Sequence, residues 1–147
     1  MPNIATETVI AASPERVWSV LAAFNHYAEW NPLNIAADGE ARIGARVRMT
    51  FLNLASAKPG ATIQDTVTVV AAEPGRELAW ASHVPLLFKG RHGFVLTPRD
   101  GATHVLHTEV LSGLIASRWN QARIATDFLP HYEAVNRALT TRVMALA

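Results

Sequence analysis

The sequence contains no cysteine, so disulfides, thiolate nucleophiles and cysteine-ligated zinc sites are excluded. It also lacks a dominant charge, because 13 Lys and Arg residues oppose 12 Asp and Glu residues for a formal net charge of +1. This balance provides no long-range field for nucleic acid or an anionic membrane, and we expect no nucleic-acid partner. No run approaches the ~20 apolar residues of a membrane span, and the first residues lack a signal-peptide pattern. We therefore expect a cytoplasmic protein without stable membrane insertion.

Three familiar catalytic motifs are missing from the sequence. There is no Gly-x-Ser-x-Gly elbow, no phosphate-binding glycine loop and no Gly-x-Gly-x-x-Gly dinucleotide fingerprint. Their absence counts against an esterase, a nucleotide hydrolase and a Rossmann dehydrogenase, and we expect no cofactor. The chain is rich in apolar residues, since 50% of its 147 residues are hydrophobic and 17% are charged. This composition favours a substantial core in a single domain over residues 1–147.

The secondary-structure signals run from a strand to short helices, then to several strands and a long final helix. Residues 3–11 are rich in β-branched side chains and predict a strand. Ser13 followed by Pro14 marks a helix start, and a short helical turn over 26–30 should stop before Pro32. Further strand-like runs, separated by turns that contain Gly, cover residues 35–37, 47–53, 62–72, 77–83, 88–97 and 103–112.

Short links between these runs require antiparallel pairing, because parallel neighbours need a long crossover. From Arg118 onward, apolar residues recur three or four apart and predict a long amphipathic helix, in which Pro130 should cause a kink. The predicted apolar stripe is Ala122, Ala125, Phe128, Leu129, Tyr132, Val135, Leu139 and Val143. We expect this helix to cover the apolar face of a curved sheet and to leave a ligand cavity between them.

Two loops have open interpretations. The loop over residues 53–60 is rich in small residues and is either a gate to the cavity or a plain connection. The apolar loop over residues 84–88 is a lid, a contact surface for a partner or membrane, or simply packing.

The last two strands carry the most informative pattern. Residues 98–101, with Pro and Gly, predict a tight turn between them. Alternation along each strand predicts two groups of neighbours: His92, Phe94 and Leu96 on one strand, and Val105, His107 and Glu109 on the next. If both groups face the same side of the sheet, an acid and two histidines sit among apolar side chains. Polar groups in such a place must be paired or must bind a ligand.

These features resemble a known family. The segments that carry the resemblance are residues 12–18 (ASPERVW), 24–32 (FNHYAEWNP), 90–97, 103–113 (THVLHTEVLSG) and 136–139. They are similar to the START-like, or SRPBCC, superfamily, and within it to the polyketide cyclase/dehydrase-like branch. The resemblance implies an α+β helix-grip fold of the START/Bet v 1 type. Such a fold has a curved seven-stranded antiparallel sheet wrapped around a long C-terminal helix, with two short helices after the first strand.

The resemblance also carries two expectations about the seventh strand. It implies that the side chains of the His-x-Glu motif, His107 and Glu109 here, point into the cavity. Leu106 and Val110 are apolar where relatives often have polar residues, which suggests an association surface on the outer face of the sheet. The sequence is compatible with both a monomer and a homodimer.

We expect apolar side chains of the cavity to supply affinity and polar ones to orient the ligand. The predicted ligand-binding residues are Trp30, Asn31, Met49, Phe51, Trp80, His92, Phe94, Leu96, Val105 and Tyr132. His107 and Glu109 are the candidate catalytic pair, because an imidazole and a carboxylate in an apolar cleft have shifted acidity. The same pair is alternatively a structural ion pair. With His92 it also has the ligand types of a two-histidine, one-carboxylate metal site, although no supporting pattern accompanies it and we expect no metal.

The sequence therefore predicts a module that binds a small hydrophobic ligand, either lipid-like or aromatic and polyketide-like. One alternative is an enzyme of cyclase or dehydratase type that uses His107 and Glu109 as acid and base. Another is a co-chaperone-like or stress-response interaction module that uses the outer sheet face. For single residues, plain roles also stay open, with Trp80 as core filler and Asn31 as a backbone partner that fixes the Pro32 turn.

Overall fold

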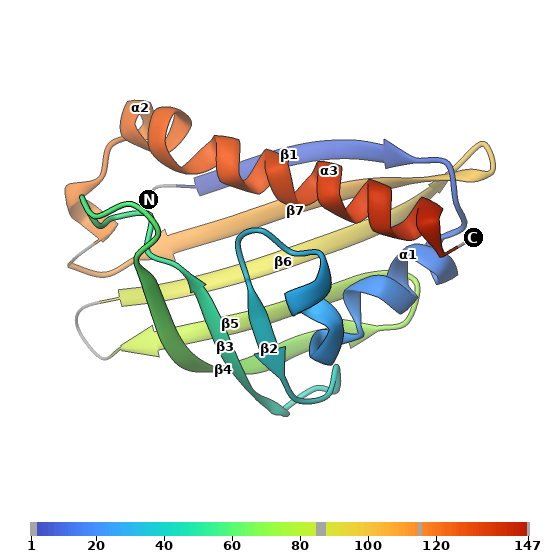
Figure 1. The fold of residues 1–147 in the computed structure, drawn as a ribbon, viewed down its shortest axis with the longest axis horizontal. Coiled ribbons are helices and arrows are strands. Elements are labelled where there is room, and N and C mark those ends of the chain that lie inside the picture. Colours follow the sequence, from blue (N-terminus) through green and yellow to red (C-terminus); the bar gives the residue numbers. More distant parts are fainter. Residues whose placement is uncertain (1–2, 85–87, 115, 147) are drawn as a thin grey trace.

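One antiparallel sheet of seven strands dominates the computed structural model, which describes residues 3–84, 88–114 and 116–146 (Figure 1). The strands are β1 (Asn3–Ile10), β2 (Ala36–Asp38), β3 (Arg46–Leu52), β4 (Thr62–Glu73), β5 (Glu77–Val84), β6 (Phe88–Arg99) and β7 (Ala102–Ser112). Their order is β1-β7-β6-β5-β4-β3-β2, which confirms the predicted antiparallel meander. Residues 85–87, the centre of the predicted apolar loop, lie outside the described residues.

Two short helices connect β1 to β2, as the sequence predicts. α1 (Pro14–Leu21) begins after Ser13, whose hydroxyl accepts a hydrogen bond from the Arg16 backbone N–H at 3.3 Å. Pro14 lies in the first turn, where its missing N–H removes no helical hydrogen bond. A 3₁₀ helix, η1 (Phe24–Glu29), follows. α1 and η1 bury apolar and aromatic side chains against the rest of the core, which anchors both helices to the sheet.

The C-terminal helical region differs from the single kinked helix that the sequence predicts. It contains η2 (Ala116–Arg118), α2 (Gln121–Arg123), a π-helical turn named η3 (Ile124–Phe128), and α3 (Leu129–Ala145). Pro130 therefore lies in the first turn of α3 rather than in a helix interior. Proline has no N–H and its ring crowds the preceding turn, and the wider π-turn just before it accommodates both effects.

The π-turn also changes which residues face the sheet. A π-turn holds an extra residue, so it rotates the apolar stripe on either side of it. Ala122 and Ala125, which we predicted on the buried stripe, are exposed, whereas Ile124 is only 1% exposed. From Phe128 onward the predicted stripe is correct, and Tyr132 and Leu139 are both buried.

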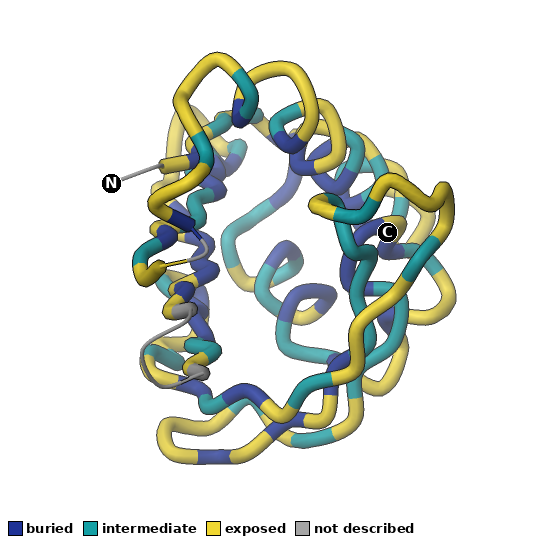
Figure 2. Tube along the Cα trace, turned by 90° about the vertical axis from the view of Figure 1, so that its left-hand side faces the viewer, coloured by how far each residue is buried: buried dark blue, intermediate teal, exposed yellow. Residues whose placement is uncertain are grey.

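The turn between β6 and β7 sets the register of the strands that carry the candidate site. Asp100 and Gly101 have positive φ values of 51° and 81°, as a two-residue type I′ turn requires. Residues 98–99, predicted within the turn, still belong to β6 and pair with β7. The register places His92 opposite Glu109, Phe94 opposite His107, and Leu96 opposite Val105. The two predicted faces therefore coincide, and Figure 2 shows buried and exposed positions alternating along the strands.

α3 crosses the concave face of the sheet beside β1 (Figure 1). A bulge between Val69 and Ala71 shifts the register of β4 against β5 and adds to the curvature of the sheet. Where α1 meets α3, side chains such as Leu21 and Leu139 are fully buried. Toward the first turn of α3 and the β3–β4 loop, the space between sheet and helix opens into a pocket.

Candidate functional site

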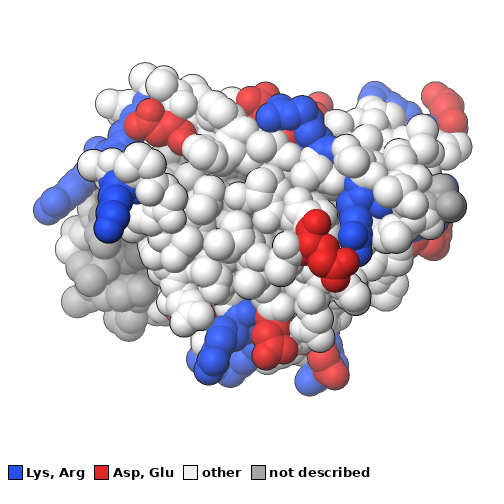
Figure 3. Space-filling model, in the orientation of Figure 1, with Lys and Arg blue, Asp and Glu red and all other residues white. Residues whose placement is uncertain are grey.

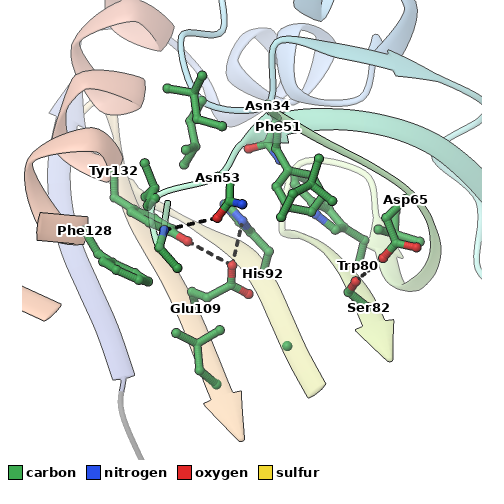
Figure 4. Close-up of a pocket in the computed structure, with 18 of the residues that line it drawn as sticks. Asn34, Phe51, Asn53, Asp65, Trp80, Ser82, His92, Glu109, Phe128 and Tyr132 are labelled. Atoms are coloured by element: carbon green, nitrogen blue, oxygen red, sulfur yellow. Dashed lines mark hydrogen bonds and ion pairs between the residues drawn. The ribbon is translucent and has the colours of Figure 1, made fainter. Parts of the chain in front are cut away.

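A pocket of about 510 Å³ lies between the concave face of the sheet, the start of α3 and the β3–β4 loop (Figure 4). Phe51, Leu54, Trp80, Trp119 and Phe128 supply much of its wall, and polar groups converge at a few points between them. This volume lies within the range of pockets that bury small organic ligands, roughly 300–1,000 Å³.

Three polar side chains meet at the part of the wall formed by β6, β7 and α3. The Tyr132 hydroxyl donates a hydrogen bond to Glu109 Oε1 at 2.9 Å, and His92 Nδ1 lies 3.4 Å from the same oxygen (Figure 4). The β6–β7 register makes His92 and Glu109 neighbours, and Tyr132 reaches them from the buried side of α3. The side chains of His92 and Glu109 are only 5% and 14% exposed, so they interact mainly with one another and with the pocket.

His107 supports this cluster from behind and does not line the pocket. Its Nε2 lies 2.6 Å from His92 Nε2, and its Nδ1 lies 3.0 Å from Asn136 Oδ1. Asn136 Nδ2 donates to Thr6 Oγ1 at 3.3 Å, which turns the amide oxygen toward His107. Burial holds the pKa of His107 well below its usual value of 6.5, and the neighbouring His92 lowers this pKa further. Hydrogen bonds to Asn136 and to the Tyr132 backbone act in the opposite direction.

These contacts assign the protons along the row of side chains. A neutral His107 that donates from Nδ1 to Asn136 must accept at Nε2, so His92 donates from its own Nε2. His92 Nδ1 then faces Glu109 Oε1 at 3.4 Å, and the two side chains form an ion pair when the imidazole is protonated. The pair places an imidazole and a carboxyl side by side at the pocket wall, and His107 acts as its positioning residue.

Tyr132 completes the cluster as a donor rather than a base. Burial raises its pKa well above the usual value of 10.0, and the adjacent Glu109 raises it further. The phenol therefore keeps its proton near neutral pH and keeps donating to Glu109.

Aromatic packing fixes the orientation of both imidazole rings. His92 stacks on Trp80 with ring centroids 4.7 Å apart and on Tyr132 with centroids 5.3 Å apart. His107 stacks on Phe94 at 4.2 Å. Stacking on both imidazole rings prevents them from rotating away from their hydrogen-bond partners. The polar side chains are therefore preorganised before any ligand binds.

The structure brings part of the predicted site together at this pocket. Phe51, Trp80, His92, Glu109 and Tyr132 all line it, and their roles in binding stay predictions. The loop over residues 53–60 borders the pocket through residues 53–55, so a gating role for this loop also stays a prediction.

The other predicted residues do not line this pocket, and their roles in ligand binding stay predictions. Met49, Phe94, Leu96, Val105 and His107 are buried beneath other side chains, each at most 4% exposed. These side chains lie on the inner face of the sheet, but other side chains separate them from the pocket. His107 does not reach this pocket, and its catalytic role stays a prediction.

Trp30 and Asn31 also lie outside the lining. Asn31 Oδ1 accepts hydrogen bonds from the backbone N–H groups of Leu33 and Asn34 at 3.0 and 2.9 Å, which is the structural role left open by the sequence. Trp30 packs edge-on against Tyr27 with centroids 5.2 Å apart. Both residues shape the loop before β2 rather than the pocket surface.

Several lining residues are missed by the sequence prediction. The sequence assigns Trp119 and Phe128 to helix packing, but both line the pocket, and their ring centroids are 5.0 Å apart. The π-turn that places Phe128 was not predicted from any sequence signal. Asn34 stands between Leu33 and Ile35, and a lone polar residue in an apolar stretch is a signal that was present in the sequence. Asp65 and Ser82 form a further polar pair in the wall, with the Ser82 hydroxyl donating to Asp65 Oδ2.

Metal binding finds no support in this geometry. Among the described residues, no group of three or more His, Asp and Glu side chains is arranged to hold a metal ion. In the trio considered from sequence, the Nε2 atoms of His92 and His107 face one another, so they cannot converge on a common third atom.

Figure 3 shows Lys, Arg, Asp and Glu mainly around the edges of one face, with an uncharged area between them. Within the part of the chain that the structure describes, none of the helices combines the length and apolarity needed to cross a bilayer.

A curved seven-stranded sheet that grips a C-terminal helix over a pocket is a helix-grip fold, so the expected START/Bet v 1-like class is confirmed. The sequence model of the family described as polyketide cyclase / dehydrase and lipid transport matches residues 1–143. The chain belongs to this family. No curated protein matches its sequence.

Solved structures of low sequence identity share the fold. A START superfamily protein from Mycobacterium smegmatis is 16% identical with a TM-score of 0.79, and 99% of each chain is covered. TTHA0849 from Thermus thermophilus is 17% identical with a TM-score of 0.77, again with 99% of each chain covered. DynU16, from the dynemicin biosynthetic locus, is 15% identical with a TM-score of 0.70 over 98% of this chain and 48% of that chain. At such identities the similarity defines the fold and leaves the ligand open.

Proposed function

We propose that the protein binds a small hydrophobic molecule, lipid-like or aromatic and polyketide-like, in the pocket between the sheet and α3. The observation that carries this proposal is a preformed pocket of about 510 Å³ whose largely apolar wall includes a preorganised polar cluster. A ligand that covers the wall gains roughly 25 cal/mol for each Å² of apolar surface removed from water. Tyr132, Glu109 and His92 then orient a polar group of that ligand. Membership of a family whose description includes lipid transport supports the same function.

Native mass spectrometry of the protein purified from its own host tests this proposal, because a co-purified molecule is seen directly as added mass. Leu111→Trp places a large side chain in the pocket wall, whereas Val110→Trp places the same side chain on the outer face of the same strand. We expect the bound fraction to fall about tenfold or more in Leu111→Trp, since overpacking displaces the ligand, and to be unchanged in Val110→Trp. Equal retention by both variants would contradict binding in this pocket.

A second candidate function is an enzyme of cyclase or dehydratase type, favoured by the Glu109 carboxyl and the His92 imidazole, which lie 3.4 Å apart at the pocket wall. In the imidazolium–carboxylate form, the Glu109 carboxylate takes a proton from a carbon next to a ligand carbonyl. The electron pair moves onto the carbonyl oxygen, and the positive charge of the His92 imidazolium stabilises the resulting enolate until Glu109 returns a proton to the carbon. His92 takes the place that the sequence prediction gave to His107.

Hydrogen–deuterium exchange into the co-purified ligand separates this candidate from simple binding. In D₂O the wild-type protein should introduce deuterium next to the carbonyl, and Glu109→Gln should bind the same ligand without exchange because an amide cannot take the proton. Tyr132→Phe, which removes a donor but not the base, should retain part of the exchange. Exchange in Glu109→Gln at the wild-type rate would rule out Glu109 as the base.

A further inference from the structure

Asp65 and Ser82 form the polar part of the pocket wall on β4 and β5. Asp65 shares its face of β4 with the lining residue Val67, and Ser82 shares its face of β5 with the lining residue Trp80 (Figure 4). Both Asp65 and Ser82 are half-buried, so part of their surface stays accessible. A molecule in the pocket therefore has access to a carboxylate and a hydroxyl oxygen.

Two neutral donors hold the Asp65 carboxylate in place. The Ser82 hydroxyl donates to Oδ2, and the Thr66 backbone N–H donates to Oδ1 at 2.8 Å. Each carboxylate oxygen can accept more than one hydrogen bond, so both keep the capacity to accept another. The hydrogen of the Ser82 hydroxyl is committed to Asp65, which leaves its oxygen as an acceptor. The pair therefore offers acceptors to a ligand and no donor.

Asp65 differs from Glu109, the other carboxyl group of the pocket, because it has no cationic partner among the described residues. None of their ion pairs includes Asp65. Glu109 Oε1 lies 3.4 Å from His92 Nδ1 and also accepts a hydrogen bond from Tyr132. A carboxylate that is partly removed from water is stabilised by a nearby cation. Asp65 is therefore the point of the wall where a positively charged ligand group is stabilised most.

Basic side chains do not offset this negative charge. None of the described residues that line the pocket is Lys or Arg. Lys89 and Arg91 flank the lining residue Gly90 on β6, but alternation places both side chains on the outer face of the sheet. There Arg91 Nη2 lies 3.3 Å from Glu77 Oε2. An anionic ligand group would thus lose its water and meet a like charge.

We propose that Asp65 is a specificity-determining residue that sets the charge of the ligand. Its carboxylate accepts a hydrogen bond from a donor on an otherwise hydrophobic molecule, most strongly from a protonated amine, and it repels carboxylate and phosphate groups. This inference rests on the proposed function and narrows its ligand class to amines and alcohols. The apolar wall contacts the hydrocarbon part of any such molecule in the same way, so the discrimination by charge comes from Asp65.

Three probes with the same aromatic body test this inference without knowledge of the natural ligand. They are 2-naphthylmethylamine, 2-naphthylmethanol and 2-naphthoate, and isothermal titration calorimetry near neutral pH measures their affinities. We expect the wild-type protein to bind the amine about tenfold or more tightly than the carboxylate, with the alcohol between them. Asp65→Asn keeps the shape and removes the charge, so the difference between amine and carboxylate should fall to about threefold or less.

Asp100→Asn is the matched control variant. It makes the same change in net charge at an exposed position of the β6–β7 turn, and asparagine tolerates the φ of 51° found there. The preference for the amine should survive in this variant. Leu111→Trp should weaken the binding of all three probes, which locates them in the pocket. If Asp65→Asn does not fold, Asp65→Ser makes the same comparison.

Two kinds of failure are distinguishable in this experiment. If the wild-type protein binds the carboxylate as tightly as the amine, or if the full preference persists in Asp65→Asn, the role of Asp65 is overturned and binding in the pocket still stands. A preference that is lost equally in Asp100→Asn would come from the net charge of the protein and would also overturn that role. If the wild-type protein binds none of the probes, or if Leu111→Trp binds all three as the wild type does, the proposed function fails and the inference fails with it.

Discussion

The interior between the sheet and α3 has two halves that use similar side chains and pack them differently. In the half near α1, residues such as Leu21, Phe24 and Leu139 are at most 1% exposed. In the half near the β3–β4 loop, Phe51 and Phe128 surround a pocket of about 510 Å³. The first half is covered by α1 and η1, whereas the second is bordered by a loop and the π-turn. The two halves therefore differ in which helices and loops cover them, and not in the hydrophobicity of their side chains.

Leu139→Ala should give the largest effect and sharpen this contrast. Leu139 is fully buried in the packed half, and removing its side chain leaves a new cavity, so we expect a loss of about 2–5 kcal/mol in the free energy of unfolding. Leu54→Ala makes the same chemical change at the wall of the existing pocket and should cost roughly half of that or less. Urea denaturation measures both values. Equal losses would show that the two halves are packed alike.

His107→Gln tests the row of polar side chains that lies between the two halves. Removal of the imidazole breaks its contacts with His92 and Asn136 and should cost about 1–3 kcal/mol at pH 7.

The pH dependence of the same variant tests the protonation state of His107. Its pKa is lower in the folded protein than the usual 6.5, so the unfolded chain binds a proton more readily below pH 6.5. Wild-type stability should therefore fall as pH falls below 6.5, by up to about 1.4 kcal/mol per pH unit from this group. The variant lacks that contribution, so its deficit should shrink from pH 7 to pH 5 in urea denaturation. A deficit independent of pH would contradict a neutral, buried His107.

Val110→Lys should give the smallest effect on stability, because it lies outside both halves. Val110 is 39% exposed on the outer face of β7, and surface substitutions usually change stability by less than about 0.5 kcal/mol. Sedimentation of the same variant tests the predicted association through Leu106 and Val110. A homodimer through this face should dissociate when the charge is introduced, whereas a monomer should sediment as the wild type does.

Most of the fold was predictable because periodicity is a local property. The antiparallel pairing of consecutive strands and the Ser13 cap follow from short links, turn residues and capping. The π-turn was not predictable in this way. It depends on how a proline at position 130 is accommodated once the helix is packed on the sheet, and it places Ile124 on the buried side instead of Ala122 and Ala125.

The candidate site was predicted in part. Alternation groups His107 with Glu109 on one face of β7, and the family resemblance makes that face the inner one, but neither tells how deep each side chain lies. His107 points to the packed side and Glu109 to the pocket, although they are two residues apart on one strand. Asn34 and Phe128 come from a loop and a π-turn, where no period relates sequence position to direction.

The sequence by itself determined the order of strands and helices, the antiparallel pairing of consecutive strands and the presence of ionisable groups among apolar ones, because these follow from residues close in the chain. The helix-grip class and the inner face of β7 came from the resemblance of its motifs to a known family. Only the tertiary structure decided which half of the interior is filled, which imidazole reaches the pocket and which carboxyl group of its wall is paired with that imidazole. These depend on contacts between side chains that are far apart in the chain. Asn136 donates a hydrogen bond to Thr6, for example, and Asn34 and Glu109 line the same pocket.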